Sequence, residues 1–282
     1  MTIKESLNRA IYKLKDAKIE QPILKARMLM QFTLDKPREY LVIYDKKELT
    51  KEQEKNYFKN VDQLIKGTPI QHITHTQEFM KLNFFVNEDV LIPRPDTEIL
   101  VEEVLEITKR LTRPNILDLC TGSVAIAVSI AKYATNANLY ASDISKKALK
   151  IARRNAESNG VYDRIQFFES DLFKNIPKMK FDIIVTNPPY IRSGDIAKLD
   201  KEVQSEPKIA LDGGIDGYDF YRKILGKAYD YLKYNGYLCM EIGYDQREFI
   251  MDIIEYEKRY NNTYCKKDLY DNDRIIVTRV GD

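Results

Sequence analysis

The chain has 282 residues, of which 31% are charged and 44% hydrophobic, and its formal net charge is +2. These values are typical of a globular protein that buries its own core, and a nearly neutral charge gives no indication of nucleic-acid binding. Three separated cysteines without a CxxC pair, no apolar signal core and no apolar run near the roughly 18 residues of a membrane helix predict a reducing, cytoplasmic protein. We expect no disulfide, no metal site and no membrane partner.

Residues 1–75 have the periodicity of a small helical bundle. Thr2 is a candidate N-cap, Pro22 suits the first turn of a later helix, and Thr50 with Gln53 forms a capping-box pattern. The region holds fifteen Lys and Arg against ten Asp and Glu, so it is mildly basic. A solvated helical surface explains this excess, and a docking face for an acidic partner is the alternative.

A change of pattern at residues 76–92 predicts a β-hairpin or an extended linker. The segment is rich in aromatic and branched residues and is broken by an Asn-Glu-Asp triplet at 87–89. Two prolines then interrupt regular secondary structure. Asp96 or Thr97 is a candidate N-cap for a helix over residues 98–108.

From Asn115 onward, apolar strand-like runs alternate with helical segments. The expected strands are residues 115–120, 138–143, 165–171, 181–186, 237–243, 263–268 and 274–280. The expected helices between them are residues 125–134, 145–160, 218–234 and 246–260. This alternation predicts an α/β domain over residues 93–282, with a mostly parallel sheet covered on both faces. Such sheets bind ligands beyond the carboxyl ends of their strands, where all the motifs below lie.

A candidate cofactor site follows the first strand, in the helix-opening turn formed by Cys120, Thr121, Gly122, Ser123 and Val124. Such a turn directs backbone N–H groups at a ligand, and Gly122 permits the close approach of a bulky group. Asp143 ends the second strand, where its carboxylate can accept from two ribose hydroxyls, and Asp171 ends the third, near the expected adenine edge. Because the turn lacks the glycines of a pyrophosphate site, we expect S-adenosylmethionine, which has no phosphate. An ordinary tight turn is the structural alternative.

The most specific motif follows the fourth strand and consists of Asn187, Pro188, Pro189 and Tyr190. Two prolines fix the backbone and remove two N–H donors, which leaves carbonyl acceptors and the Asn side chain. A planar –NH2 group has two hydrogens to donate, and we expect the Asn187 side-chain oxygen and the Pro188 carbonyl to accept one each. Tyr190 is expected to stack on the flat face of the substrate group. A rigid turn leaving a strand is the alternative.

This arrangement suits a planar amide or amino nitrogen, which is a poor nucleophile because its lone pair is delocalised. Each neutral hydrogen bond contributes only about 1 kcal/mol net, whereas positioning in a dry site contributes roughly 7–11 kcal/mol. We therefore assign the motif an orienting and polarising role, without a strong base. Both histidines, His72 and His75, precede the sheet region and are expected to be surface or packing residues.

Several segments together resemble a known family. An Asn-Pro-Pro-Tyr motif after strand four is shared by adenine-N6 DNA methyltransferases and by release factor glutamine methyltransferases. Further segments resemble the second family, namely residues 89–98, 206–207, 211–217, 221–222, 241–246 and 267–274. The chain is therefore similar to the release factor glutamine methyltransferases over nearly its whole length.

This resemblance implies a class I methyltransferase, with a Rossmann-like seven-stranded, mostly parallel sheet, an N-terminal helical bundle and a β-hairpin connector. It implies transfer of a methyl group from S-adenosylmethionine, leaving S-adenosylhomocysteine, to the glutamine side-chain nitrogen in the Gly-Gly-Gln loop of bacterial peptide chain release factors. Residues 1–75 would help to bind the release factor, and the substrate glutamine would lie on residues 187–190. The implied cofactor contacts are residues 120–124, Asp143, Leu172 and Asn187.

The chain departs from the family pattern beside the expected cofactor. Family members usually have Gly where Cys120 and Val124 stand, and an aromatic residue can occur at the position of Leu172. These departures bear on cofactor affinity more than on reaction type. Arg94 is a candidate contact for substrate or cofactor, and equally for a structural ion pair. Glu241 is either a ligand or a buried, paired carboxylate.

Two other functions fit part of this pattern. An adenine-N6 nucleic-acid methyltransferase would share the whole chemical site, but it should add a basic DNA-reading region, and the near-neutral charge disfavours one. We therefore expect no direct nucleic-acid partner. A non-catalytic domain that binds the cofactor, with turnover lost through Val124, is the other alternative, and calorimetry followed by a turnover assay would separate it.

Overall fold

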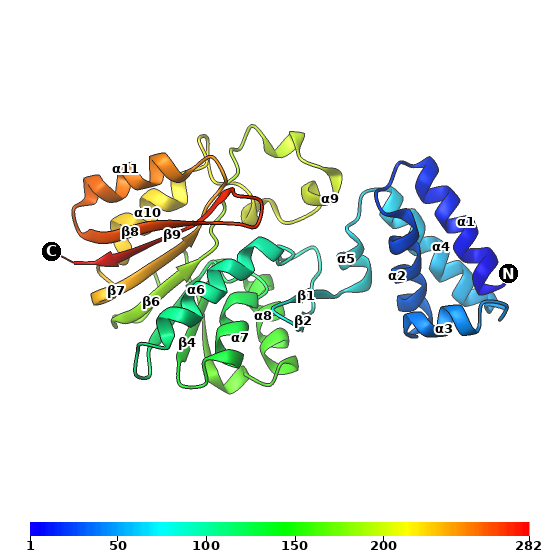
Figure 1. Ribbon diagram of the computed structural model, residues 1–282, viewed down its shortest axis with the longest axis horizontal. Coiled ribbons are helices and arrows are strands. Elements are labelled where there is room, and N and C mark those ends of the chain that lie inside the picture. Colours follow the sequence, from blue (N-terminus) through cyan, green and yellow to red (C-terminus); the bar gives the residue numbers. More distant parts are fainter. Residues whose placement is uncertain (282) are drawn as a thin grey trace. The chain divides into compact units, whose positions relative to one another are not determined.

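The structure, a computed structural model, describes residues 1–281 in two compact units (Figure 1). The helical unit contains Met1–Thr76 and Asp200–Ser205, and the sheet unit contains Gln77–Leu199 and the chain from Glu206 onward. Asp282, the last residue of the expected domain over 93–282, lies outside the described residues. No helix among residues 1–281 is both long and apolar enough to cross a membrane.

The helical unit packs short helices around a core of its own. Its helices are α1 (Ile3–Asp16), α2 (Pro22–Leu34), α3 (Arg38–Ile43), α4 (Lys51–Ile65), α5 (Ile70–Thr74) and α9 (Lys201–Gln204). Thr2 and Thr50 each complete a capping box at the start of α1 and α4, which confirms both predicted caps. Leu14, Leu29 and Tyr57 are fully buried in the core between these helices.

The sheet unit is built on seven strands in the order β5-β4-β3-β6-β7-β9-β8. The strands are β3 (Asn115–Leu119), β4 (Asn138–Asp143), β5 (Ile165–Glu169), β6 (Phe181–Thr186), β7 (Leu232–Glu241), β8 (Tyr260–Lys267) and β9 (Asp273–Val280). The first five pair in parallel, and β9 runs antiparallel to both β7 and β8. The chain builds outward from β3 through β4 to β5 and then returns to β6 on the other side of β3. The boundary between β3 and β6 is therefore the topological switch point, where such sheets bind ligands.

Helices cover both faces of this sheet (Figure 1). One face carries α6 (Glu98–Thr108), α7 (Ala125–Tyr133) and α8 (Lys146–Ser158), and the other carries α10 (Asp219–Ala228) and α11 (Arg247–Glu257). Successive residues of β6 enter opposite cores, because Ile183 packs with α6, α7 and α8 whereas Ile184 packs with α10 and α11. Burial on both sides explains why the central strands are continuous apolar runs. The expected α/β fold with a mostly parallel, seven-stranded sheet is confirmed.

The hairpin forms, but its turn lies earlier in the chain than the sequence predicted. β1 (Gln77–Phe79) and β2 (Leu82–Phe84) pair antiparallel around Met80 and Lys81, so the expected break at 87–89 is wrong. Both turn residues have positive φ, 50° and 59°, which a two-residue type I′ turn requires. Neither is the Asn or Gly that usually marks such a turn, so no local pattern indicated where the chain turns.

The start of α6 also differs from expectation. Thr97 ends a short 3-10 turn, η1 (Pro95–Thr97), and occupies the N-cap position of α6, but its side chain makes no capping hydrogen bond. Thr97, one of the two predicted candidates, is therefore the N-cap residue by position, but its side chain does not cap a backbone N–H. The Thr97 hydroxyl is bonded to Glu241, at the end of a strand 144 positions along the chain.

Candidate active site

The carboxyl ends of β3 and β6 lie side by side, because Leu119 pairs with Thr186 at the end of their parallel ladder. The turn after β3 and the Asn-Pro-Pro-Tyr motif after β6 therefore meet at the switch point. A pocket opens there. Among the expected site residues it is lined by Cys120, Gly122, Asp143, Asp171, Leu172, Asn187 and Pro189. The structure thus brings the two motifs to one pocket together with Asp143, at the end of β4, and Asp171, which lies just beyond the end of β5 at Glu169 and not at the strand end that the sequence predicted.

The turn after β3 bends through three left-handed residues, Cys120 (φ 58°), Gly122 (φ 54°) and Val124 (φ 66°). Glycine adopts this conformation freely, whereas for a residue with a side chain it costs roughly 1–2 kcal/mol. An ideal Cβ built on Gly122 would meet no atom within 4 Å, so the middle of the turn is open. Val124 is fully buried, and Cys120 lines the pocket. The two departures from the family pattern therefore fall where the backbone favours glycine.

A buried carboxylate, Asp118, supports this turn from behind. Its Oδ2 accepts from the Thr121 hydroxyl at 2.6 Å and from the Ala127 backbone N–H at 3.2 Å. Its Oδ1 has no hydrogen-bond partner among residues 1–281. Burial raises the pKa of Asp118 to about 7, and the two hydrogen bonds oppose that rise. Thr121 therefore holds the turn through Asp118 and does not line the pocket.

Asp143 ties the turn after β3 to the start of α8. Its Oδ2 accepts from the Gly122 backbone N–H at 2.9 Å, and its Oδ1 accepts from the Ser145 backbone N–H at 2.8 Å. Burial raises the pKa of this carboxyl, while the backbone hydrogen bonds oppose the rise. Each carboxylate oxygen has a further lone pair, so Asp143 keeps the capacity to accept from hydroxyl groups in the pocket.

The lining of the pocket is otherwise largely apolar, and its charged side chains are mostly acidic. Apolar surface comes from Val90, Leu91, Ile144, Leu172, Ile209 and Phe220. Charged lining side chains are Asp89, Asp143, Asp171 and Lys223. Three carboxylates against one lysine disfavour a phosphate ligand and suit a neutral or cationic one. The residues that follow Pro207 were not expected at the site, because only the fold returns them over the strand ends.

The motif after β6 is backed closely by residues 211–217. A Cβ on Gly213 would come within 2.7 Å of the Tyr190 Cα, and a Cβ on Gly217 would come within 2.6 Å of the Tyr190 carbonyl oxygen. Gln246 Nε2 donates to the same carbonyl at 3.1 Å. These glycines are therefore needed for close packing behind the motif. Burial also raises the pKa of the Tyr190 hydroxyl, so this group stays protonated.

A chain of hydrogen bonds leads from Asn187 into the core. Asn187 Nδ2 donates to the Thr97 hydroxyl at 3.2 Å, and the Thr97 hydroxyl donates to Glu241 Oε2 at 2.6 Å. Thr97 and Glu241 are both buried. Burial raises the pKa of Glu241 to about 7, while the hydrogen bond from Thr97 and the charge of Arg274 oppose the rise. Of its two expected roles, Glu241 has the buried, paired one.

Arg94 forms an ion pair with Glu206, whose second oxygen accepts from the Ile92 backbone N–H at 2.9 Å. The Glu206 side chain is only 1% exposed, so this pair holds the segment before α6 in place. The structural ion pair, one of two expected roles for Arg94, is present. The expected site residues that do not line the pocket are Thr121, Ser123, Val124, Pro188, Tyr190 and Arg94.

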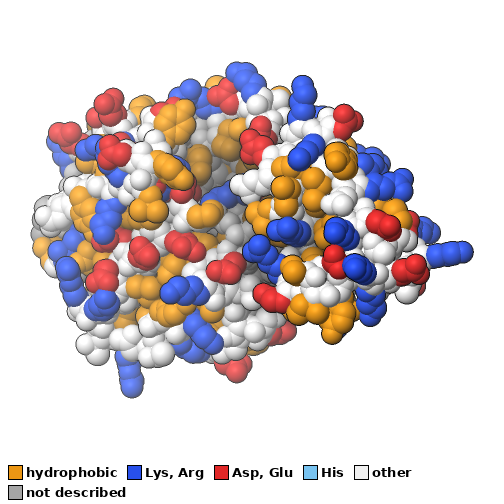
Figure 2. All heavy atoms as spheres, turned by 45° about the vertical axis from the view of Figure 1, so that its right-hand side comes forward, with side chains coloured by type: hydrophobic (Ala, Val, Ile, Leu, Met, Phe, Trp, Pro, Cys, Tyr) orange, Lys and Arg blue, Asp and Glu red, His pale blue; other side chains and the backbone are white. Residues whose placement is uncertain are grey.

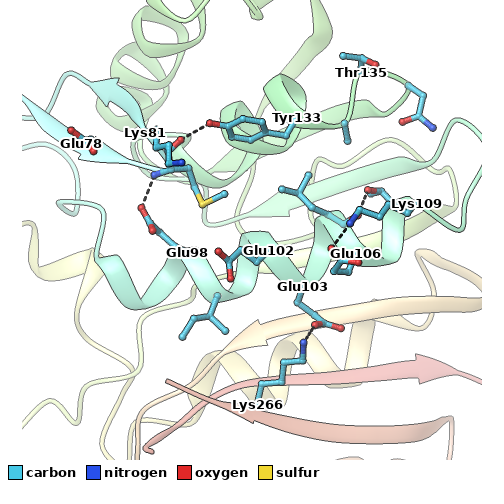
Figure 3. A pocket seen from close by; sticks show the side chains of 16 residues that line it. Glu78, Lys81, Glu98, Glu102, Glu103, Glu106, Lys109, Tyr133, Thr135 and Lys266 are labelled. Atoms are coloured by element: carbon cyan, nitrogen blue, oxygen red, sulfur yellow. Dashed lines mark hydrogen bonds and ion pairs between the residues drawn. The ribbon is translucent and has the colours of Figure 1, made fainter. Parts of the chain in front are cut away.

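A second hollow in the sheet unit is lined by α6, α7, the hairpin and β8 (Figure 3). Its charged side chains are largely bonded to their neighbours. Glu103 is paired with Lys266, and Glu98 accepts from the Met80 backbone N–H at 2.6 Å. These contacts hold the hairpin and β8 against α6. We therefore place the chemistry in the pocket at the strand ends.

The sheet order, the pocket at the switch point and the motif after β6 define the chain as a class I methyltransferase. Residues 95–209 match the methyltransferase small domain family, and residues 5–74 match the PrmC N-terminal domain family. The release factor glutamine methyltransferase of Clostridium acetobutylicum is 39% identical over 100% of this chain and 99% of that one. That of Moorella thermoacetica is 38% identical over 98% of each chain. The chain belongs to the release factor glutamine methyltransferase family.

A solved structure of a methyltransferase from Pyrococcus furiosus has the same fold. It is 20% identical, and the match covers 71% of this chain and 88% of that one with a TM-score of 0.50.

Proposed function

We propose that the chain transfers a methyl group from S-adenosylmethionine to the side-chain nitrogen of the glutamine in the Gly-Gly-Gln motif of peptide chain release factors. The observation that carries the proposal is the position of Asn187, which lines the same pocket as the turn after β3. A methyl donor held by the turn and an amide held by the motif would then be neighbours. The two relatives at 39% and 38% identity are named release factor glutamine methyltransferases, which supports a release factor glutamine as the substrate.

The pocket fits S-adenosylmethionine in chemistry. Asp143 offers acceptors for ribose hydroxyls, and Asp171 and Leu172 line the end where the adenine would lie. The excess of carboxylates suits a sulfonium cation and gives no site for a pyrophosphate. The open face at Gly122 leaves room for a ligand close to the backbone.

The cofactor supplies an electrophilic methyl carbon, and the protein supplies orientation. Asn187 Oδ1 and the Pro188 carbonyl accept the two hydrogens of the glutamine –NH2, which directs the nitrogen lone pair at the methyl carbon. In the transfer the methyl carbon would exchange its bond to the sulfonium sulfur for a bond to the glutamine nitrogen, S-adenosylhomocysteine would leave as a neutral thioether, and the methylated nitrogen would lose one proton to solvent. The chain therefore needs no strong base, and the main contribution comes from positioning in a buried site.

We assign the remaining parts of the chain as a substrate-recognition domain over residues 1–75, a hairpin linker over 76–92 and the methyltransferase domain over 93–282. The helical unit carries exposed apolar side chains on two of its helices, with Ile23 46%, Leu24 51%, Val42 70% and Ile43 69% exposed. Figure 2 shows Lys and Arg side chains spread among apolar ones on this unit. A mixed basic and apolar surface suits contact with a folded protein substrate.

The test is mass spectrometry of a purified release factor after incubation with the chain and isotopically labelled S-adenosylmethionine. We expect one labelled methyl group on the glutamine of the Gly-Gly-Gln loop. A release factor with Gln→Ala in that loop is the matched control and should stay unlabelled. Label on an adenine-containing duplex, with none on the release factor, would contradict the proposal in favour of a nucleic-acid methyltransferase. Cofactor binding by calorimetry without any transfer would contradict it in favour of a non-catalytic domain.

A further inference from the structure

We infer that Thr97 and Glu241 are positioning residues, which hold the Asn187 amide in the orientation that presents its Oδ1 to the substrate nitrogen. The inference rests on the proposed function, because that function needs Oδ1 as an acceptor. A primary amide can turn by half a rotation about its last bond and exchange its donor and acceptor ends. An unrestrained Asn187 would therefore point –NH2 at the substrate –NH2 part of the time, and two donors cannot form a hydrogen bond.

The direction of the hydrogen bonds follows from the chemistry at the buried end. Above its pKa of about 7 Glu241 is ionised and can only accept, so its Oε2 takes the single hydrogen of the Thr97 hydroxyl at 2.6 Å. The Thr97 oxygen can then only accept from its other neighbour, 3.2 Å away. That neighbour must be the –NH2 end of Asn187. The opposite end, Oδ1, remains for the substrate.

Other contacts keep the carboxylate in place. The Tyr221 hydroxyl donates to the Glu241 backbone carbonyl at 2.9 Å, which fixes the last residue of β7. Arg274, ion-paired with Asp268 and Asp96, favours the charged form of Glu241. The Asn187 amide favours the charged form too. The hydrogen bonds from Asn187 through Thr97 to Glu241 therefore all run in one direction.

The sequence supports a role for the hydroxyl beyond helix capping. Thr97 occupies the N-cap position of α6, where a Thr hydroxyl normally accepts from a backbone N–H one turn later, yet it makes no such bond. Its hydroxyl is committed to Glu241 and Asn187 instead. A purely structural role would be to satisfy two buried groups, and its loss would lower stability without a specific effect on turnover.

The test compares three variants of the full chain acting on the release factor. Thr97→Val keeps the shape and removes the hydroxyl, and Thr97→Ser restores it. Thr108→Val is the matched control, because Thr108 is a buried threonine at the other end of α6 whose hydroxyl donates to the Leu105 carbonyl. The measurements are kcat, the Kd of S-adenosylmethionine by calorimetry and the thermal unfolding temperature.

For Thr97→Val we expect kcat to fall at least about tenfold, since misplacing a reacting group by 1 Å can cost about 100-fold. The cofactor Kd should stay within a factor of about two of wild type. Thr97→Ser should recover most of kcat, and Thr108→Val should lose none. A Thr97→Val variant that matches Thr108→Val in kcat overturns the inference, and so does a Thr97→Ser variant as slow as Thr97→Val. A wild-type chain that leaves the release factor unmethylated overturns the proposed function instead, and the inference with it.

Discussion

The two motifs that meet in the pocket keep their shapes by different means. The turn after β3 carries side chains at two left-handed positions, Cys120 and Val124, where glycine would be free of strain. The motif after β6 is made rigid by two prolines, and the glycines needed for close approach, Gly213 and Gly217, lie on the segment behind it. The departures at Cys120 and Val124 thus fall in the turn that faces the expected cofactor. Cofactor affinity and turnover should therefore respond to different substitutions.

The largest effect should follow Asn187→Ala, which removes the acceptor on the catalytic side. We expect kcat to fall by about 100-fold or more, as for the loss of one preorganised group facing a reacting centre. The unfolding temperature should stay near that of wild type, because Asn187 is only half-buried. Single-turnover kinetics with a release factor measures the change, and Asn262→Ala, at an exposed position, is the control. A rate near that of wild type would remove Asn187 from its assigned role.

On the cofactor side, Asp143→Ala should weaken S-adenosylmethionine binding. Hydrogen bonds to a charged group contribute about 1.5–3 kcal/mol, so their loss should raise Kd by roughly 10–100-fold. The substitution also frees the Gly122 N–H, which the carboxylate now holds at 2.9 Å. Asp143→Asn keeps one acceptor oxygen and should lie between alanine and wild type. Calorimetry with cofactor alone gives the answer, and unchanged affinity in the alanine variant would exclude Asp143 from the ribose role.

The sequence predicted those features whose cause is local. The N-cap at Thr2 and the capping box at Thr50 depend on residues one turn apart. The pocket position followed from strand alternation, since strand ends of a parallel sheet share one edge. Lys223 was not predicted at the site, because no local pattern shows that α10 returns over that edge.

Two other differences between the prediction and the structure arose from contacts between residues far apart in the sequence. Asp96 or Thr97 was expected to cap α6, but the Thr97 oxygen accepts from the Asn187 amide and not from a backbone N–H of the helix. The helix expected over residues 218–234 ends at Ala228, and the chain is already in β7 from Leu232. Asn235, at φ 61°, lies where β7 shifts register against β6, which lets the strand begin early. Pairing with a neighbouring strand decided this boundary, and a single segment carries no information about its partner.

The rate of methyl transfer should also depend on pH. The pKa of Glu241 is raised to about 7, so the carboxyl gains a proton as pH falls through that value. A protonated carboxyl can donate to Thr97, which removes the fixed direction of the hydrogen bonds to Asn187. We expect kcat to be highest above about pH 7 and to fall by up to about tenfold per pH unit below it. Arg274, Asp96 and Tyr190 also face this carboxyl, with Arg274 opposing its protonation.

Glu241→Gln separates this titration from others, because the amide keeps an acceptor for Thr97 and has no proton to gain. Its profile of kcat against pH should lack the inflection near pH 7, whatever its absolute rate. A profile with the same inflection as wild type would assign the titration to another group. Measuring the cofactor Kd at each pH separates a change in cofactor binding from a change in kcat.

The smallest effects should come from restoring glycine in the cofactor turn, and they should have opposite signs. Cys120→Gly removes left-handed strain of roughly 1–2 kcal/mol and adds chain entropy to the unfolded state worth about 0.5–1 kcal/mol, so we expect a slight gain in stability. Val124→Gly relieves similar strain, but burying a valine side chain contributes about 1.5–3 kcal/mol. Because Val124 is fully buried, that loss exceeds the relief and the variant should be less stable. Denaturant unfolding of both variants measures the difference. If both lose stability equally, backbone strain does not distinguish this turn from the motif after β6.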